Sequence, residues 1–342
     1  MTATQPSGLP RLLITRELPA QVITRAQQYF VVTLWPEDRP IGAELTRLAR
    51  AQDALLVMSN DRVDASLLAG CAPGLRAIAT YSAGFDHIDI ATATRYGIPV
   101  FTTPNVLSEA VAEIALYLIL GAARRTRRAE SVLRGGEWGP WSPSFMVGMQ
   151  LTGRRLGIYG MGAIGREIAK RASSFGLKIH YFNRQRLPLE LEMSAVYCDS
   201  LESLMACSDI FCVAAPSTPE TRSSVNRERM SLLPRGALLV NIARGDLVDE
   251  DALLELVGQG HIANVGLDVF RGEPHIDSRW LDLPEALLLP HIGSSSEVAR
   301  VDMGLTALAA LEQHFVGAVP PNCLNPSVYT KRPIDQPIAK VS

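Results

Sequence analysis

The stretch Arg155-Leu-Gly-Ile-Tyr-Gly-Met-Gly-Ala-Ile-Gly165 decides the fold, because an apolar run leads directly into a Gly-x-Gly-x-x-Gly turn. Residues 166–175 then continue with a helical pattern. A strand, a glycine-rich turn and a helix in this order are the context that a dinucleotide-binding fingerprint requires. Gly160 would permit the tight turn, Gly162 would let a pyrophosphate approach the backbone, and Gly165 would let the helix pack on the strand.

The segment after the next predicted strand, 178–182, indicates which dinucleotide is bound. An NAD-binding protein would carry Asp or Glu there to bind the adenosine ribose. This chain instead has Asn183-Arg-Gln-Arg186, and its first acidic side chain comes only at Glu190. Arginines attract and hydrogen-bond a 2′-phosphate that a carboxylate would repel. We therefore expect NADP(H) in preference to NAD(H), with Arg184 as the leading contact and Arg186 as the second.

Short apolar runs alternate with helical patterns along the chain, which predicts parallel sheets with helices on their faces. Predicted strands lie at 11–15, 54–58, 75–79, 98–101, 155–159, 177–182, 210–214, 237–242, 265–269 and 286–289. Predicted helices lie at 19–30, 65–69, 108–121 and from about 296 onward. The arginines within 124–128 are interpreted as the solvated end of a helix. Residues 135–148 form a loop with Trp138 and Trp141.

Length and composition exclude several classes of protein. The chain has 342 residues, 47% of them hydrophobic and 20% charged, which favours two compact domains. The net charge of −2 gives no reason to expect a nucleic-acid partner. The longest apolar run, 114–123, is much shorter than the roughly 20 residues of a membrane span, and no targeting segment is evident. The five cysteines form no CxxC pair and no pattern with histidines, so we expect no metal and a reducing cytoplasm.

Three further motifs follow or include predicted strands: Asn241-Ile-Ala-Arg-Gly245, Gly266-Leu-Asp-Val-Phe-Arg-Gly-Glu-Pro274 and Pro290-His-Ile-Gly-Ser294. Ligands bind at the carboxyl ends of strands in open α/β sheets. Together with the glycine-rich loop, these motifs closely resemble the D-isomer-specific 2-hydroxyacid dehydrogenase family, from Arg11 to about Pro326. The paired arginines after the second strand and the tryptophan loop resemble its glyoxylate/hydroxypyruvate reductase branch.

The resemblance implies reduction of a 2-keto acid by hydride from C4 of a nicotinamide. Arg244 would bind the substrate carboxylate and carbonyl oxygen, and His291 would protonate that oxygen. Glu273 would hydrogen-bond His291, orient it, and raise its pKa so that it stays protonated. The backbone N–H groups of Ala83 and Gly84 would bind the carboxylate from the other domain. His87 and His275 are rival proton donors, but neither follows a strand end.

The resemblance also implies a set of cofactor contacts. Asp268 would contact the nicotinamide carboxamide, and Thr221 with the Ala215-Pro216 turn would line the cofactor cleft. The complete predicted set is Gly160, Met161, Gly162, Ala163, Ile164, Gly165, Asn183, Arg184, Arg186, Ala215, Pro216, Thr221, Ile242, Ala243, Asp268 and Gly293.

The expected architecture is α/β, with two Rossmann-like parallel-sheet domains. A cofactor domain, residues 107–297, would be inserted into a flavodoxin-like substrate domain made of residues 1–106 and 298–342. Domain closure would exclude water from the site. The family commonly forms homodimers through the cofactor domains, and Trp141 is our candidate for a loop tryptophan that reaches the partner's active site. The alternative is that Trp141 anchors the loop in its own subunit.

Glyoxylate and hydroxypyruvate fit the sequence best, because no basic cluster beyond Arg244 is present to neutralise a second anion. Two alternatives stay open. One is the same chemistry on another acid, D-lactate-like or with a larger side chain. The other is a non-enzymatic dinucleotide sensor similar to the C-terminal-binding-protein corepressors, which share the fold and the catalytic residues.

Overall fold

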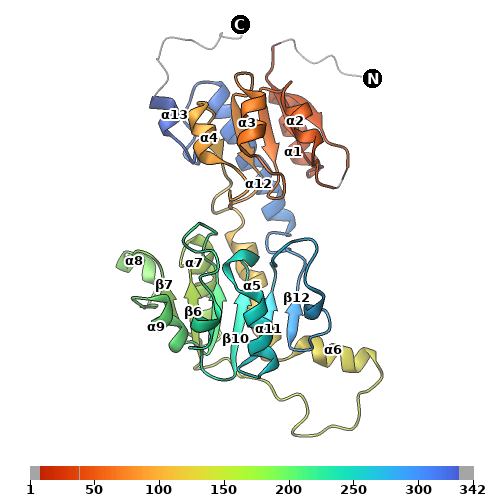
Figure 1. Cartoon of the computed structure of the whole chain (residues 1–342), viewed down its shortest axis with the longest axis vertical. Coiled ribbons are helices and arrows are strands. Elements are labelled where there is room, and N and C mark those ends of the chain that lie inside the picture. The colour runs from red at the N-terminus through yellow and green to blue at the C-terminus, as the bar shows by residue number, and fades with distance from the viewer. Residues whose placement is uncertain (1–7, 38, 331–342) are drawn as a thin grey trace. The chain divides into compact units, whose positions relative to one another are not determined.

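The computed structural model describes residues 8–37 and 39–330, and it divides the chain into two compact units. One unit combines the chain up to Leu107 with the chain from Ser296 onward, and we call it the discontinuous unit. The other, Ser108–Ser295, is the inserted unit (Figure 1). Each has its own parallel sheet, so the predicted fold class of two parallel-sheet α/β domains is confirmed.

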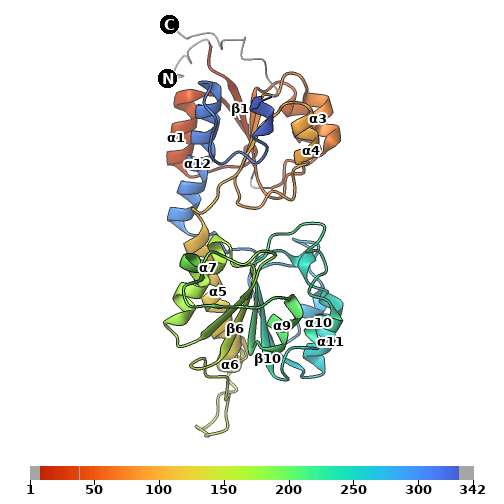
Figure 2. The same ribbon diagram turned by 90° about the vertical axis from the view of Figure 1, so that its left-hand side faces the viewer.

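The discontinuous unit contains a five-stranded sheet in the order β2-β1-β3-β4-β5. Its strands are β1 (Arg11–Ile14), β2 (Val31–Leu34), β3 (Ala54–Val57), β4 (Ala77–Thr80) and β5 (Val100–Phe101). Its helices are α1 (Ala20–Tyr29), α2 (Glu44–Ala49), α3 (Ala65–Cys71), α4 (Ile90–Arg95), α12 (Glu297–Phe315) and α13 (Ser327–Thr330). Helices α1 and α12 cover one face, and α2, α3 and α4 cover the other (Figure 2). This strand order is the flavodoxin-like one.

Segments from the two ends of the chain are packed closely in this unit. A Cβ atom on Gly304 of α12 would lie 2.5 Å from a methyl group of Val22 of α1, so only glycine allows this helix contact. The Asn325 side chain accepts a hydrogen bond from the Val100 N–H (2.8 Å) and donates one to the Ile98 carbonyl (2.9 Å). The returning segment is therefore part of the core of the unit and fixes the edge strand β5.

The inserted unit contains a seven-stranded parallel sheet in the order β12-β11-β10-β9-β6-β7-β8. Its strands are β6 (Arg155–Tyr159), β7 (Lys178–Phe182), β8 (Val196–Tyr197), β9 (Ile210–Val213), β10 (Ala237–Asn241), β11 (Ile262–Leu267) and β12 (Ala286–Leu288). Its helices are α5 (Ser108–Ala123), α6 (Thr126–Arg134), α7 (Ala163–Ser173), α8 (Leu189–Glu192), α9 (Leu201–Ala206), α10 (Arg227–Met230) and α11 (Glu250–Gly258). Helices α5 and α7 cover one face, and α9, α10 and α11 cover the other (Figure 2).

The strand order changes direction between β6 and β9. The carboxyl ends of these two strands are therefore the switch point of a Rossmann sheet. The central strands are buried along their whole length, since helices cover both faces of the sheet. The glycine-rich turn follows β6 at this switch point. The loops after β10, β11 and β12 lie at the same carboxyl end of the parallel sheet. The strand order therefore gathers all four sequence motifs at one end of one sheet.

Three local predictions differ from the structure. Strands β2 and β8 were not expected. The arginine run 124–128 does not end a helix, since α5 stops at Ala123 and a new helix, α6, starts at Thr126. Arg125 between them has a φ of +54°, and this left-handed residue changes the direction of the chain.

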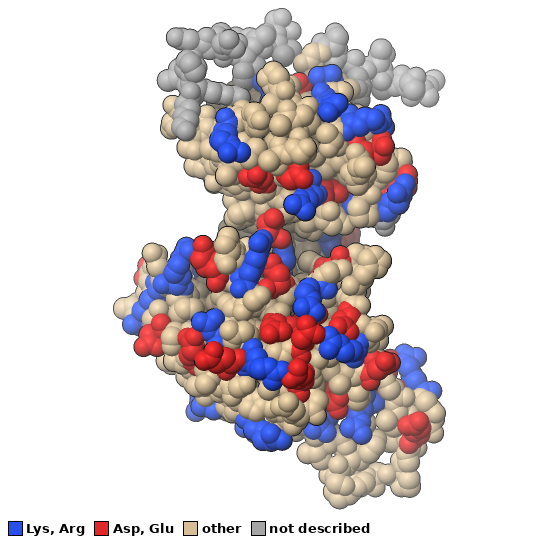
Figure 3. Space-filling view, in the orientation of Figure 1, with Lys and Arg blue, Asp and Glu red and all other residues tan. Residues whose placement is uncertain are grey.

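No helix within the described residues is long and apolar enough to cross a membrane. Basic and acidic side chains are interspersed over the visible face of each unit (Figure 3). This mixture follows from the near balance of 33 Lys and Arg against 35 Asp and Glu.

Candidate active site

The glycine-rich turn after β6 has the spacing that the sequence motif predicts. Gly160 has a φ of +102°, and a Cβ atom there would lie 2.5 Å from the backbone nitrogen of Ala215. A Cβ on Gly165 would lie 2.2 Å from the carbonyl oxygen of Gly160. At Gly162, by contrast, no atom lies within 4 Å of the position of a Cβ. Two glycines thus allow close packing of the turn, and the third faces open space.

The N-terminus of α7, directly after Gly162, fits an anion. Side chains cap several other helices: Asp64 caps α3, Asp89 α4, Ser200 α9, Asn226 α10, Asp249 α11 and Ser296 α12. Helix α7 has no side-chain cap. The first N–H groups of a helix have no partner within it, and the helix dipole favours negative charge there. The open space at Gly162 and the uncapped N–H groups therefore suit the pyrophosphate of a dinucleotide.

The segment after β7 separates the two arginines into different environments. The Asn183 side chain accepts a hydrogen bond from the Met161 N–H (2.7 Å), which ties this segment to the glycine-rich turn. Arg184 is exposed and makes no hydrogen bond or ion pair with any other described residue. Arg186 forms a two-pronged ion pair with Glu192, with N–O distances of 2.7 and 3.0 Å.

Glu192 was not expected from the sequence, because it lies nine positions beyond Asn183 on a separate short helix. Its buried carboxylate also accepts a hydrogen bond from the Tyr181 hydroxyl (2.6 Å). The bonds from Arg186 and then Tyr181 lower the pKa of Glu192 to about 2. The carboxylate is therefore ionised at neutral pH and neutralises the charge of Arg186.

The loop after β10 presents Arg244. The buried Asn241 side chain accepts from the Ala243 N–H (3.0 Å) and donates to the Arg244 carbonyl (2.9 Å), which fixes a tight turn. A Cβ on Gly245 would lie 2.0 Å from the carbonyl carbon of Phe270, so this turn touches the loop after β11. The sequence motif identified these residues as a group, and the structure shows that Asn241 shapes the turn.

Glu273 and His291 are in direct contact. Oε2 of Glu273 lies 2.7 Å from Nδ1 of His291, and Oε1 accepts the Phe270 N–H at 2.7 Å. Burial alone would raise the pKa of Glu273, but the hydrogen bond and charge of His291 outweigh it, and the nearby charge of Arg244 adds to their effect. The net result is a pKa of Glu273 below its ordinary value.

The ionised Glu273 determines which ring nitrogen of His291 is available for chemistry. A carboxylate can only accept hydrogen bonds, so Nδ1 of His291 must carry the proton in their contact. Nε2 makes no hydrogen bond with another described residue, and about two fifths of the side chain (39%) is exposed. The ring can therefore exchange a proton with a bound molecule through Nε2.

Asp268 holds the backbone on which His291 lies. His291 has a φ of +54°, an unusual left-handed conformation for a non-glycine residue, and its N–H donates to the Asp268 carbonyl (2.9 Å). The two carboxylate oxygens of Asp268 accept the N–H groups of Ile292 (2.7 Å) and Gly293 (2.8 Å). Burial raises the pKa of Asp268, and these two hydrogen bonds oppose that effect. The predicted contact of Asp268 with a nicotinamide stays a prediction.

In the discontinuous unit, the turn after β4 presents free N–H groups. The Ser82 hydroxyl donates to the Gly84 carbonyl (2.6 Å), and the Thr102 hydroxyl donates to the Ala83 carbonyl (3.0 Å). The N–H groups of Ala83 and Gly84 have no acceptor among the described residues. The carbonyls of Ala83 and Gly84 are thus already hydrogen-bonded, and their N–H groups are available. A carboxylate requires such N–H donors.

The remaining predicted residues lie in several places. The Thr221 hydroxyl donates to the Pro216 carbonyl (2.7 Å), which closes the turn after β9. Ile242 and Ala243 are buried directly after β10. Trp141 lies in the loop between α6 and β6 and is 84% exposed.

The two rival histidines lie in different units. Nε2 of His87 contacts the Thr80 hydroxyl (3.0 Å) in the discontinuous unit. His275 is exposed on the loop after β11, and no hydrogen bond joins its side chain to Glu273 among the described residues.

The chain is similar to known proteins over most of its length. The model of the family "D-isomer specific 2-hydroxyacid dehydrogenase, NAD binding domain" matches residues 116–293. A glyoxylate reductase of Thermococcus kodakarensis is 40% identical over 329 residues, which cover 94% of this chain and 98% of the relative. A glycerate dehydrogenase of Hyphomicrobium methylovorum is also 40% identical, over 90% of this chain and 97% of the relative.

A solved structure shows the same likeness. The NADPH-dependent glyoxylate/hydroxypyruvate reductase of Sinorhizobium meliloti, in complex with NADP and malonate, has a TM-score of 0.83 and 31% identity over 95% of this chain and 99% of its own. The chain belongs to the D-isomer-specific 2-hydroxyacid dehydrogenase family and is therefore an oxidoreductase. Its relatives place it in the glyoxylate reductase branch, so the predicted family and branch are confirmed.

Proposed function

We propose that the protein reduces small 2-keto acids, glyoxylate and hydroxypyruvate foremost, to 2-hydroxy acids with NADPH. The observation that carries the proposal is the Glu273–His291 pair, with Nδ1 bound to a carboxylate and Nε2 available. Arg244, on the neighbouring loop, supplies the positive charge that a keto acid requires. The names of the relatives, glyoxylate reductase and glycerate dehydrogenase, support the same reaction class.

The proposed reaction transfers one hydride and one proton to the substrate. The reduced nicotinamide supplies the hydride to the carbonyl carbon when it is bound. Nε2–H of His291 donates its proton to the carbonyl oxygen as negative charge develops there, and Glu273 stabilises the imidazolium before the transfer. The planar guanidinium of Arg244 binds the substrate carboxylate and orients the carbonyl group toward His291. Solvent then returns the proton to His291.

The inserted unit is the proposed cofactor domain, and the discontinuous unit the proposed substrate domain. The free N–H groups of Ala83 and Gly84 suit the carboxylate of the substrate. We propose in addition a homodimer formed through the cofactor domains, with Trp141 reaching the partner's site. The cytoplasmic location stays a prediction; all five cysteines are free, as is usual in a reducing compartment.

The choice of NADPH rests on Arg184. It is exposed and makes no hydrogen bond or ion pair among the described residues, although the charge of Glu220 is nearby, whereas Glu192 neutralises Arg186. Replacing Arg184 by Ala should raise the KM for NADPH by roughly 10–100-fold, the worth of a hydrogen bond to a charged group, and leave the KM for NADH unchanged. The matched variant Arg186→Ala should have the smaller effect. If Arg186→Ala alone weakened NADPH binding, the phosphate contact would belong to that residue.

The deciding experiment measures initial rates with glyoxylate and with hydroxypyruvate, each with NADPH and with NADH, by the loss of absorbance of the reduced nicotinamide. Turnover with a clear preference for NADPH is expected. Equal rates with NADH would keep the reaction and remove the argument from Arg184. If a wider panel of 2-keto acids also gave no turnover while NADPH bound, the protein would be a dinucleotide sensor rather than a reductase.

A further inference from the structure

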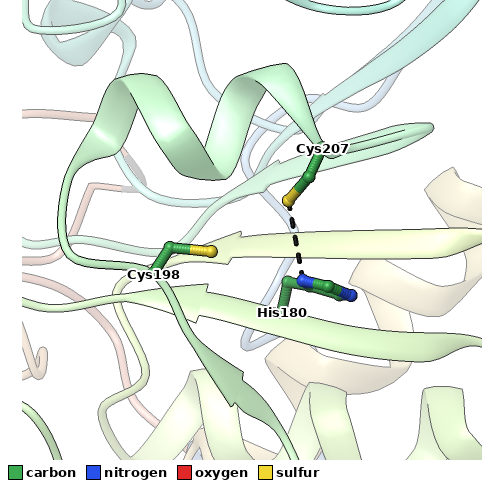
Figure 4. A group of neighbouring side chains, drawn as sticks. All are labelled: His180, Cys198 and Cys207. Atoms are coloured by element: carbon green, nitrogen blue, oxygen red, sulfur yellow. Dashed lines mark hydrogen bonds between the residues drawn. The ribbon is translucent and has the colours of Figure 1, made fainter.

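A cluster of His180, Cys198 and Cys207 lies in the inserted unit, away from the motifs at the strand ends. His180 is in the middle of β7, Cys198 directly follows β8, and Cys207 ends α9 (Figure 4). One potential ligand atom from each residue lies within 4.8 Å of the other two. Nδ1 of His180 is 3.5 Å from Sγ of Cys207. Among the described residues, no other group of His, Cys, Asp or Glu is gathered in this way.

We propose that these three side chains bind a zinc ion, with water as the fourth ligand. Tetrahedral zinc has bonds of about 2.3 Å to sulfur and about 2.0 Å to nitrogen, so its ligand atoms lie roughly 3.5–3.8 Å apart. The contact between His180 and Cys207 already has this spacing. Small rotations of the side chains would bring Cys198 to the same separation. Two sulfur ligands with one imidazole favour zinc over the hard cations magnesium and calcium.

The backbone around the cluster is fixed by regular structure, so the ligands are held near one another before a metal arrives. Strand β7 pairs with β8 at His180 and Val196, and the Cys198 N–H donates to the Tyr181 carbonyl (2.8 Å). Helix α9 packs on β6 and β7 and ends at Cys207. Each ligand therefore lies on or next to a strand or helix, and binding would cost little conformational entropy.

The charges around the cluster are compatible with a divalent cation. Arg155, at the start of the neighbouring strand β6, is a positive charge close to His180. Arg155 itself forms an ion pair with Asp209 (3.1 Å), which offsets its repulsion of a metal. All three side chains are half-buried, so a bound ion would be partly shielded from water. A metal binds cysteine as the thiolate, and two thiolates would balance the double charge of the ion.

The sequence predicted no metal site, because no two of these ligands form a local motif. His180, Cys198 and Cys207 come from three consecutive elements, and only the pairing of β7 with β8 and the packing of α9 bring them together. The cluster does not include any residue of the proposed reaction. Its occupancy should stabilise the β7–β8–α9 region rather than take part in hydride transfer.

The experiment uses the full-length, untagged protein, reduced with a non-chelating phosphine and stripped with a chelator. Zinc is titrated against a competing indicator dye, and cobalt serves as the spectroscopic probe. We expect one zinc per chain with a Kd below about 1 μM, a rise in the Tm of the protein with zinc, and a thiolate-to-cobalt charge-transfer band. Keto acid reduction by the stripped protein should equal that of the loaded protein, which separates this test from that of the proposed function.

Variants identify the ligands. Cys198→Ser, Cys207→Ser and His180→Gln should each weaken zinc binding by more than the roughly 10–100-fold that loss of an outer-shell partner costs. Cys323→Ser, which changes a half-buried cysteine of the discontinuous unit, should bind zinc like the unaltered protein. Circular dichroism confirms that each variant is folded before binding is measured.

Three results would overturn the proposal. One is binding of zinc that none of the three variants weakens. Another is bound cobalt without a thiolate charge-transfer band. The third is a Cys198–Cys207 disulfide in protein purified without reductant, together with no zinc binding by the reduced protein; the two cysteines would then be a redox pair.

Discussion

The side chain of His291 is oriented by two carboxylates with different tasks. Glu273 bonds to the ring, and Asp268 bonds to the two N–H groups that follow His291 in the chain. A left-handed φ at a non-glycine residue costs of the order of 1–3 kcal/mol, and such residues concentrate at functional sites. The hydrogen bonds of Asp268 offset this cost. The strained backbone therefore aims the imidazole, and the ionised Glu273 fixes its tautomer.

Replacing His291 by Ala should mainly lower kcat, because in the proposed reaction this residue transfers its proton in the transition state. We expect a loss of roughly 10²–10⁴-fold with glyoxylate and a small change in the KM for NADPH. Stopped-flow and steady-state rates across neutral pH measure this loss of kcat. The matched variant His275→Ala, which removes a rival histidine on the Glu273 loop, should keep nearly full activity. Full activity of His291→Ala would remove it as the proton donor.

Replacing Asp268 by Asn tests whether it positions His291. The amide can accept through one atom only, so one N–H group of Ile292 or Gly293 loses its partner, at about 1–3 kcal/mol. We expect kcat to fall at least about 10-fold. Because the variant also removes a negative charge close to the imidazolium, the alkaline limb of the pH–rate profile should move to lower pH.

A control separates this effect from a general loss of stability. Asp249→Asn changes the N-cap of α11 in the same unit, and Asn caps helices as well as Asp does. Its pH–rate profile should match that of the unaltered enzyme. An Asp268→Asn variant with a lower Tm but an unchanged pH–rate profile would show a structural role alone.

At the scale of elements, the segment between β7 and β8 depends on one buried carboxylate. Glu192 bonds to Arg186 and to the Tyr181 hydroxyl, and that hydroxyl also accepts the Leu187 N–H (3.1 Å). The side chain thus anchors the segment that contains Arg184 to the strand before it. If Arg184 has the proposed role, cofactor selectivity and the stability of this edge of the sheet are linked through Glu192.

Glu192→Gln should reduce stability at neutral pH and weaken its pH dependence in acid. The folded protein holds the pKa of Glu192 at about 2, below its ordinary value of 4.5. A carboxylate with a lowered pKa stabilises the fold above the unfolded value, and this contribution is lost as the pH falls from about 4.5 to about 2. The difference in unfolding free energy between the variant and the unaltered protein should therefore shrink across this window.

Urea unfolding followed by tryptophan fluorescence, to which the buried Trp280 of the inserted unit contributes, measures this difference. Glu190→Gln, two positions earlier on the exposed side of α8, is the matched control and should leave the curve unchanged. A difference that stays constant from pH 7 to pH 3 would contradict the role of the ionised carboxylate.

The sequence predicted the elements whose pattern is local. The largely apolar segments at 54–58 and 237–242 indicated buried parallel strands, and β3 and β10 lie there. Strand β2 escaped prediction because Val31–Leu34 follows α1 with only one residue between them, and β8 because it has two residues.

In the candidate site too, local sequence patterns were predictive and long-range contacts were not. The spacing of the motifs brought together the residues that touch each other, Glu273 and His291. The side chains that hold the site loops in place could not be predicted. Each of them pairs with a backbone group or a charge outside its own motif. Asp268 with Ile292 and Glu192 with Arg186 are examples. No periodicity in the sequence records such contacts, since they depend on the course of the loops.

At the scale of the whole molecule, the exposed tryptophan loop is where the proposed dimer can be tested. Trp141 is 84% exposed and Trp138 is 67% exposed. Large aromatic side chains that are exposed to water usually mark a binding surface. Sedimentation should show a dimer. Trp141→Ala should lower kcat/KM by about 10-fold, the effect of losing an interface anchor worth about 1.4 kcal/mol. Trp138→Ala is the matched control; equal activity of both variants in a stable dimer would assign Trp141 to its own subunit's loop.

The close contact of α12 with α1, and of Asn325 with β5, has a consequence for the order in which the protein matures. A ribosome makes the chain from its N-terminus, so the first 107 residues emerge long before α12 exists. The inserted unit is continuous in sequence and can fold as soon as it leaves the exit tunnel. Until α12 is made, α1 alone covers that face of the half-built sheet, so we expect the N-terminal third of the chain to need chaperone protection during synthesis.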